Sequence, residues 1–118
     1  MSMLALVLIG LVALLHLYFL VLEMFLWTKP KGRRVFVLSS EQAAQTRVLA
    51  ATQGLYTGFL AAGPIWGIRP GAQGEAIRLF FLICVLIAGI YGGFTAHRKI
   101  FFVQALPAAL GIAATLLA

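Results

Sequence analysis

The sequence predicts an all-α membrane protein, a bundle of four transmembrane helices that run up, down, up and down. Four apolar stretches are each long enough, or nearly so, to cross a bilayer, which takes about 20 residues as helix. These stretches lie at about 3–27, 48–68, 79–96 and 100–118. Hydrophobic residues make up 63% of the chain and charged residues 10%, proportions typical of integral membrane proteins. We therefore expect a single transmembrane domain over residues 1–118.

The basic residues predict how these helices are oriented. Lys and Arg favour the cytoplasmic side of a membrane. Seven of them flank the first and third connections: Lys29, Lys31, Arg33, Arg34, Arg47, Arg98 and Lys99. Only Arg69 and Arg78 lie in the second. We therefore expect connections one and three in the cytoplasm and both termini outside.

Charge also bears on the partners that the chain should have. The formal net charge is +6, but the positive residues sit beside apolar stretches, where they meet the headgroups of the lipid bilayer. Nucleic-acid binding would need aromatic residues interleaved with these charges outside the membrane, and few are present. The sequence therefore predicts lipid, and no nucleic acid, as the partner of its basic segments.

The first two helices have recognisable ends. The first is expected over about 3–27, because Pro30 cannot continue a helix and Gly32 tolerates a left-handed turn. The second is expected over about 40–68, with Ser39 as its N-cap and Gln42 completing a capping box.

The remaining two helices follow short connections. The third is expected over about 72–96, after the Pro70–Gly71 pair, and the fourth over about 100–118, after a tight turn at His97–Lys99.

Small residues recur at a spacing of four on two of these helices. Gly54 and Gly58 share a face of the second helix, and Gly89 and Gly93 share a face of the third. Such faces let helix backbones approach closely in lipid. They are expected either to join helices within the chain or to form the seam of a homodimer.

Glu23 is the one charged residue inside an apolar stretch. A carboxylate in hydrocarbon costs several kcal/mol unless it is protonated, paired or hydrated, so it marks a functional site. At 1.5 Å per residue, Glu23, Gln53, Tyr91 and Gln104 all lie about 6–9 Å below the cytoplasmic boundary. One polar side chain from each helix is thus expected in a common layer that faces into the bundle.

Two further side chains extend this layer. Tyr56, with Thr57, lies one turn beyond Gln53, and His16 lies two turns, or about 10 Å, beyond Glu23. The candidate ligand-binding residues are therefore Glu23, His16, Gln53, Tyr56, Tyr91 and Gln104. Glutamine and tyrosine can also act only as hydrogen-bonded links between membrane helices, an interpretation that remains open here.

Several strings along the chain carry a family resemblance. They are His16 with Glu23–Trp27, then Gln53–Gly63, Gly89–Gly93 and Phe102–Pro107. Together they resemble a family of small bacterial four-helix membrane proteins known as domain of unknown function 1304, over nearly the whole chain. Asparagine is common in that family at the positions of Thr52 and Thr57. The resemblance implies a multi-pass protein of the bacterial cytoplasmic (inner) membrane, and no established activity.

Three functions remain open at this point. The first is binding or transport of a small ligand or ion, with Glu23 as the ionisable centre. The second is a membrane enzyme that acts on a lipid or isoprenoid head group, with Glu23 and His16 as acid and base. The third is a non-catalytic accessory subunit. The sequence contains no metal-ligand cluster and no glycine-rich phosphate loop, so neither a metal nor a cofactor is expected.

Overall fold

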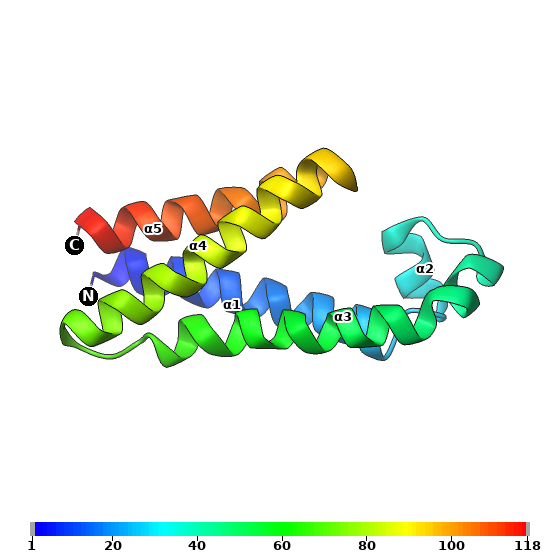
Figure 1. Cartoon of the computed structure of the whole chain (residues 1–118), viewed down its shortest axis with the longest axis horizontal. Helices are drawn as coiled ribbons and strands as arrows, with labels where there is room; N and C mark the ends of the chain where they lie inside the picture. Colours follow the sequence, from blue (N-terminus) through cyan, green and yellow to red (C-terminus); the bar gives the residue numbers. More distant parts are fainter. Residues whose placement is uncertain (1, 118) are drawn as a thin grey trace. The chain divides into compact units, whose positions relative to one another are not determined.

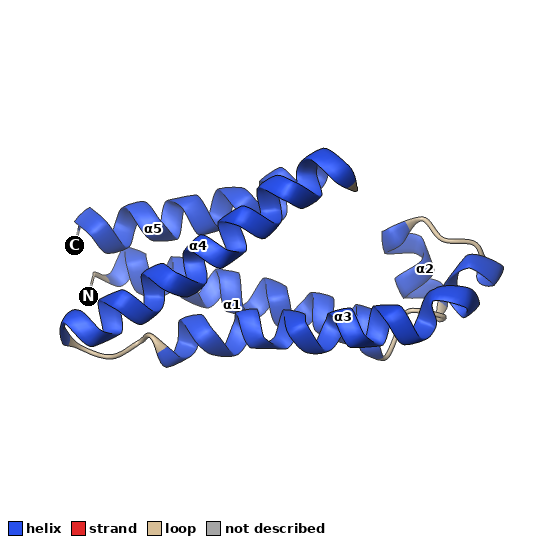
Figure 2. Ribbon diagram, viewed as in Figure 1, coloured by secondary structure: helices blue, strands red, loops and turns tan. Residues whose placement is uncertain are grey.

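The computed structural model describes residues 2–117, and within this range all regular secondary structure is helical (Figure 2). In chain order the elements are α1 (Met3–Met24), α2 (Pro30–Phe36), α3 (Ser40–Trp66), α4 (Gly71–Thr95), the π-helical turn η1 (Phe101–Ala105) and α5 (Leu106–Leu117) (Figure 1). The predicted all-α class is confirmed for these residues. Among them, α1 and α4 are long and apolar enough to cross a membrane, and Phe101–Leu117 is apolar but shorter.

The first connection holds a helix where the sequence predicted a break. Pro30 is the first residue of α2, and Gly32 is buried inside that helix rather than in a left-handed turn. Proline is well suited to this position, since a first-turn N–H has no helical partner to lose. Lys29 is extended, at φ −84° and ψ 160°, as a residue before proline must be. Helix α1 therefore ends at Met24, about one turn earlier than expected.

The predicted capping box at the start of α3 is confirmed. The Gln42 N–H donates to Ser39 Oγ at 3.0 Å, and the Ser39 N–H donates to Gln42 Oε1 at 3.0 Å. Two backbone donors that would otherwise be orphaned at the helix start are thus satisfied reciprocally.

The predicted fourth helix is interrupted by η1. The Leu106 N–H donates to the Phe101 carbonyl, five residues back instead of four. Pro107 follows directly, and in a regular helix its ring would clash with the carbonyl four residues earlier. A single wide turn before the proline relieves that clash while the helix continues.

The described chain divides into two compact units, and α1 and α3 contribute residues to both. The first consists of the described parts of Met1–Leu15 and Leu60–Ala118. In it α4 packs against η1 and α5 (Figure 1). Its apolar core is Ile9, Val12, Leu82, Val85 and Ala108, with Leu60, Leu86 and Ile112 packed against them.

Arg78 ties two elements of this first unit together. Arg78 lies on α4, within the predicted third helix, and its side chain is only 6% exposed, although the sequence counted it among the charges of the second connection. One guanidinium nitrogen donates to the Gly67 carbonyl at 2.8 Å and to the Arg69 carbonyl at 3.2 Å. Arg78 therefore adds a side-chain donor to two carbonyls that follow α3, of which that of Gly67 also accepts from the Arg69 N–H at 2.9 Å. Basic side chains often take such a role at helix C-termini.

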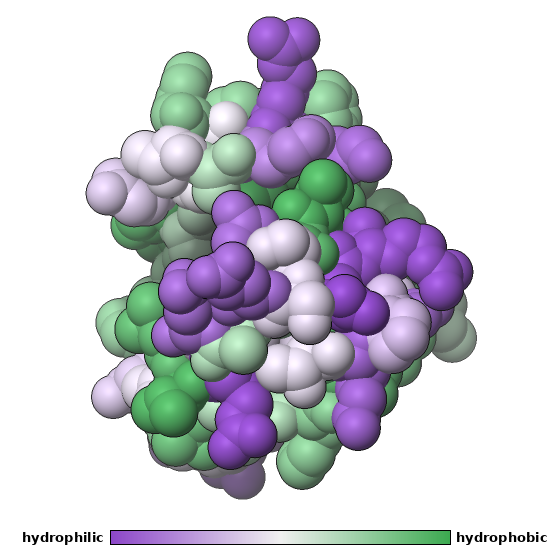
Figure 3. Space-filling view, turned by 90° about the vertical axis from the view of Figure 1, so that its right-hand side faces the viewer, coloured by the Kyte–Doolittle hydropathy of each residue, from purple (hydrophilic) through white to green (hydrophobic). Residues whose placement is uncertain are grey.

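The second unit, His16–Phe59, contains the end of α1, all of α2 and most of α3. Figure 3 looks onto the end that carries α2, where hydrophilic side chains gather around α2 and the start of α3. Glu23, the acidic residue of the candidate site, belongs to this second unit. The surroundings of its carboxyl group can therefore be described within that unit.

Candidate functional site

Helices α1 and α3 approach each other closely around Gly54. A Cβ added at Gly54 would lie 2.5 Å from Met24 Cγ and 3.2 Å from Glu23 Cβ. A Cβ added at Gly58 would lie 2.7 Å from a methyl of Leu20. The predicted small-residue face of α3 is thus occupied by α1 of the same chain, and this contact sets the position of Glu23.

Glu23 lies in the last turn of α1 and faces Thr57 of α3. The Thr57 hydroxyl donates to Glu23 Oε1 at 3.1 Å, and it also lies 2.9 Å from the Gln53 carbonyl. Thr57 is 7% exposed, and Glu23 is half-buried. Because α1 ends early, Glu23 is nearer the helix end than the sequence predicted.

The donors and acceptors of Thr57 determine which protonation states of Glu23 this pair can accommodate. A hydroxyl carries one hydrogen and two acceptor lone pairs. When Glu23 is ionised, Thr57 can give its hydrogen to the carboxylate. When Glu23 is protonated, the carboxyl can donate to Thr57, and Thr57 can turn its hydrogen to the Gln53 carbonyl. Both protonation states are therefore satisfied by the same heavy-atom arrangement.

Two other predicted site residues of this unit lie near Thr57 along α3 but do not join the pair. The side chains of Gln53 and Tyr56 are exposed, and that of Tyr56 is 57% exposed. The Tyr56 ring meets Phe59 edge-on, with centroids 5.7 Å apart. Gln53 contributes its backbone carbonyl rather than its amide.

His16 is 2% exposed on α1. Seven residues of helix place it about 10 Å along the axis from Glu23. The acid–base pairing of Glu23 with His16 therefore has no direct contact to support it.

The remaining two predicted residues belong to the first unit. Tyr91 is 71% exposed, and its carbonyl accepts a hydrogen bond from the Thr95 hydroxyl at 2.7 Å. Gln104 is half-buried in η1. Convergence of these two residues with Glu23 stays a prediction.

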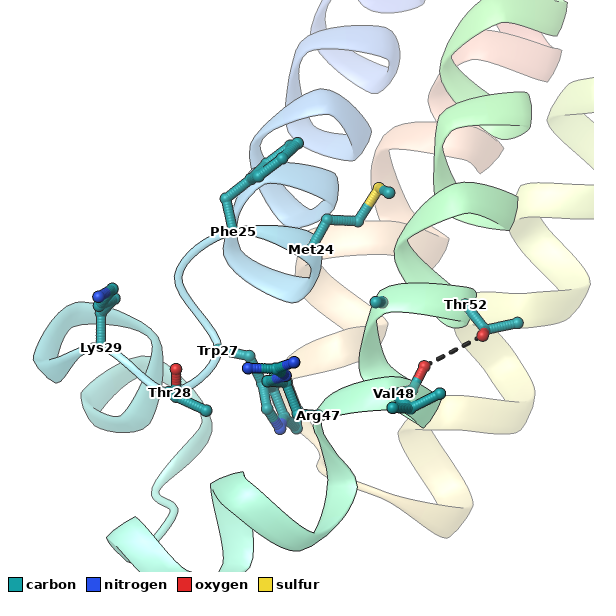
Figure 4. A pocket seen from close by; sticks show the side chains of 9 residues that line it. Met24, Phe25, Trp27, Thr28, Lys29, Arg47, Val48 and Thr52 are labelled. Atoms are coloured by element: carbon teal, nitrogen blue, oxygen red, sulfur yellow. Dashed lines mark hydrogen bonds between the residues drawn. The ribbon is translucent and has the colours of Figure 1, made fainter.

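The second unit also contains a hollow of about 460 Å³, bounded by the end of α1, the turn before α2, and α3 (Figure 4). Apolar side chains line one part of it, including Met24, Phe25 and Val48. Lys29 and Arg47 contribute two positive charges to its polar part. Glu23 does not line the hollow, so the carboxyl pair and the cationic hollow are separate features.

Sequence reasoning missed two parts of this arrangement. Thr57 was noted only as a neighbour of Tyr56, although its position four residues after Gln53 on a glycine-lined face could have identified it as the partner of Glu23. Lys29 and Arg47 were interpreted as topology signals that meet lipid headgroups, and not as the lining of a hollow. No group of three or more His, Cys, Asp or Glu residues that could hold a metal ion occurs among residues 2–117.

Comparison with known proteins gives a family and no activity. The family model described as protein of unknown function (DUF1304) matches residues 10–116. The uncharacterized protein YpaA of Lactococcus lactis subsp. lactis (strain IL1403) is 35% identical over 107 residues, which cover 88% of this chain and 89% of that protein. No solved structure matches.

Proposed function

Because this chain belongs to the DUF1304 family, whose description assigns no function, we propose one from its own residues: binding or transport of a proton or small cation across a membrane, centred on Glu23. The observation that carries the proposal is the hydrogen bond of 3.1 Å between Glu23 and Thr57 at the end of a helix apolar enough to span a bilayer. No comparison contributes to the choice of ion.

The energetics of a carboxyl in hydrocarbon support an ion-binding role. A neutral carboxyl is tolerated there, whereas a carboxylate needs a cation or hydrogen-bond donors. Thr57 supplies one donor to the carboxylate. The C-terminal end of α1 carries partial negative charge, which adds attraction for a proton or cation. A structural link between helices would need no such charge, since glutamine could form it at lower cost.

The proposal includes the four-span topology in the bacterial inner membrane, with both termini outside. The apolar character of α1 and α4 supports it, as does the concentration of basic residues in and around α2 and in the 96–100 turn.

Cysteine labelling in intact cells tests this topology. The change Lys31→Cys should give a thiol that a membrane-impermeant maleimide labels only after the inner membrane is opened. The matched change Arg69→Cys, in the other kind of connection, should be labelled from the periplasmic side without that step. Labelling of position 31 from the periplasm would overturn the topology.

Proton flux in proteoliposomes tests the function. With the membrane potential clamped, the wild-type protein is expected to dissipate a pH gradient faster than protein-free liposomes do. The change Glu23→Gln keeps size and hydrogen bonding but mimics only the protonated state, so the flux should fall to the protein-free rate. Glu41→Gln, an exposed change of the same kind, should keep the wild-type rate. Equal flux in wild type and Glu23→Gln would contradict the role of Glu23.

A further inference from the structure

The hollow beside the end of α1 has the lining of a site for an anion with an apolar tail. Lys29 and Arg47 are exposed cations, and neither side chain makes a hydrogen bond or ion pair within the described part of the chain. Positive charge is thus concentrated there with no internal carboxylate to neutralise it. Arginine and lysine together are suited to phosphate, the arginine through its fork of donors and the lysine as a point charge.

The apolar part of the hollow points to a lipid rather than to a free ion. Phe25 and Val48 line it, and they are 65% and 75% exposed. Thr52 adds no donor, because its hydroxyl donates to the Val48 carbonyl at 3.0 Å (Figure 4). An inorganic phosphate would occupy only the polar part of the hollow, whereas a phospholipid would also cover these apolar side chains.

The walls of the hollow are held in place before any ligand arrives. The Trp27 indole N–H donates to Thr46 Oγ1 at 2.9 Å, and the Thr46 hydroxyl donates to the Gln42 carbonyl at 2.8 Å. The Trp27 ring also packs against Phe36 of α2, with centroids 4.8 Å apart. This network fixes the turn that carries Lys29 to the helix that carries Arg47, so little ordering is needed on binding.

We propose that this hollow binds the phosphate headgroup of an anionic phospholipid between Lys29 and Arg47, with the start of an acyl chain against Phe25 and Val48. On the proposed topology it opens at the cytoplasmic leaflet, whose negative surface potential attracts basic segments. The site shares no residue with the Glu23–Thr57 pair, so either proposal can fail without the other.

Tryptophan quenching by brominated lipid tests this site directly. The chain has two tryptophans, so Trp66→Phe leaves Trp27, which lines the hollow, as the sole reporter. In mixed micelles, phosphatidylglycerol with brominated acyl chains should quench Trp27 at far lower mole fractions than brominated phosphatidylcholine does. The double change Lys29→Gln/Arg47→Gln should weaken the phosphatidylglycerol response about thirtyfold, since each basic residue near an anionic lipid contributes a factor of about five.

Two controls separate a specific site from surface charge. Arg98→Gln/Lys99→Gln removes the same charge from the other basic connection and should keep the full response. Lys29→Arg/Arg47→Lys keeps both charges and should also respond, which would show that the two positions need positive charge rather than the particular native side chains. The circular dichroism spectrum of the neutral variant should match that of the wild type.

Three outcomes would overturn the proposal. One is equal quenching by the two lipids, and another is an equal loss of response in the Arg98/Lys99 control. The third is a Trp27 response to inorganic phosphate that phosphatidylglycerol does not reproduce, which would identify a free-phosphate site.

Discussion

Replacing Arg78 with methionine should lower the free energy of unfolding by about 2 kcal/mol, the usual contribution of a hydrogen bond made by a charged group in a buried setting. The change keeps an apolar stem of similar length but removes the donors to the Gly67 and Arg69 carbonyls. The Arg69 carbonyl would then lose its side-chain donor, and the Gly67 carbonyl would keep only the Arg69 N–H, at 2.9 Å. Chemical denaturation of the purified protein in detergent, followed by circular dichroism, measures the loss.

Arg69→Met provides the matched control for Arg78. Its side chain lies in the same connection and is exposed, so removing its charge should change stability by less than about 0.5 kcal/mol. An equal effect of the two changes would mean that net charge, rather than the carbonyl contacts of Arg78, determines stability here.

A leucine at Gly54 should destabilise the second unit. The new side chain would overlap Met24 and press against Glu23 and the Leu20 carbonyl. Overpacking of this kind typically costs about 1–3 kcal/mol. Because the same contact brings Glu23 to Thr57, the change should also weaken that hydrogen bond, with loss of proton flux in proteoliposomes.

Gly10→Leu is the control for that change. Gly10 also lies in a helix, but a Cβ added there meets nothing within 4 Å. The control should therefore fold and function like the wild type. If Gly54→Leu were equally well tolerated, the close approach of α1 and α3 would not be what positions Glu23.

Much of the helical pattern was predictable from the sequence because it depends on local chemistry. Long apolar runs marked α1 and α4, and the Ser39–Gln42 pair marked the start of α3 through bonds between residues three apart. Glu23 was found because a carboxyl in an apolar run is conspicuous without any knowledge of its neighbours.

The structural features that the sequence did not predict depend on the three-dimensional surroundings of a residue and not only on its neighbours in the chain. Pro30 was interpreted as a helix stop, although the same lack of an N–H suits it to the first turn of α2. Counting residues aligned Tyr91 in depth with Glu23, but depth does not determine the direction of a side chain around the helix axis. The Glu23–Thr57 pair joins residues 34 apart, so only the packing of α1 on α3 reveals it.

The most direct test of the central claim, that Glu23 takes up and releases a proton, is infrared spectroscopy of its carboxyl group in lipid. The chain has three acidic side chains, so Glu41→Gln/Glu75→Gln leaves Glu23 as the only one. Titration across about pH 4 to 9 should show a protonated-carboxyl band that appears reversibly and is missing when Glu23→Gln is added. Thr57→Val, which removes the hydroxyl while keeping the shape, should shift the frequency of that band. A carboxyl that stays in one protonation state throughout the titration, or a band that Thr57→Val leaves unmoved, would contradict the account.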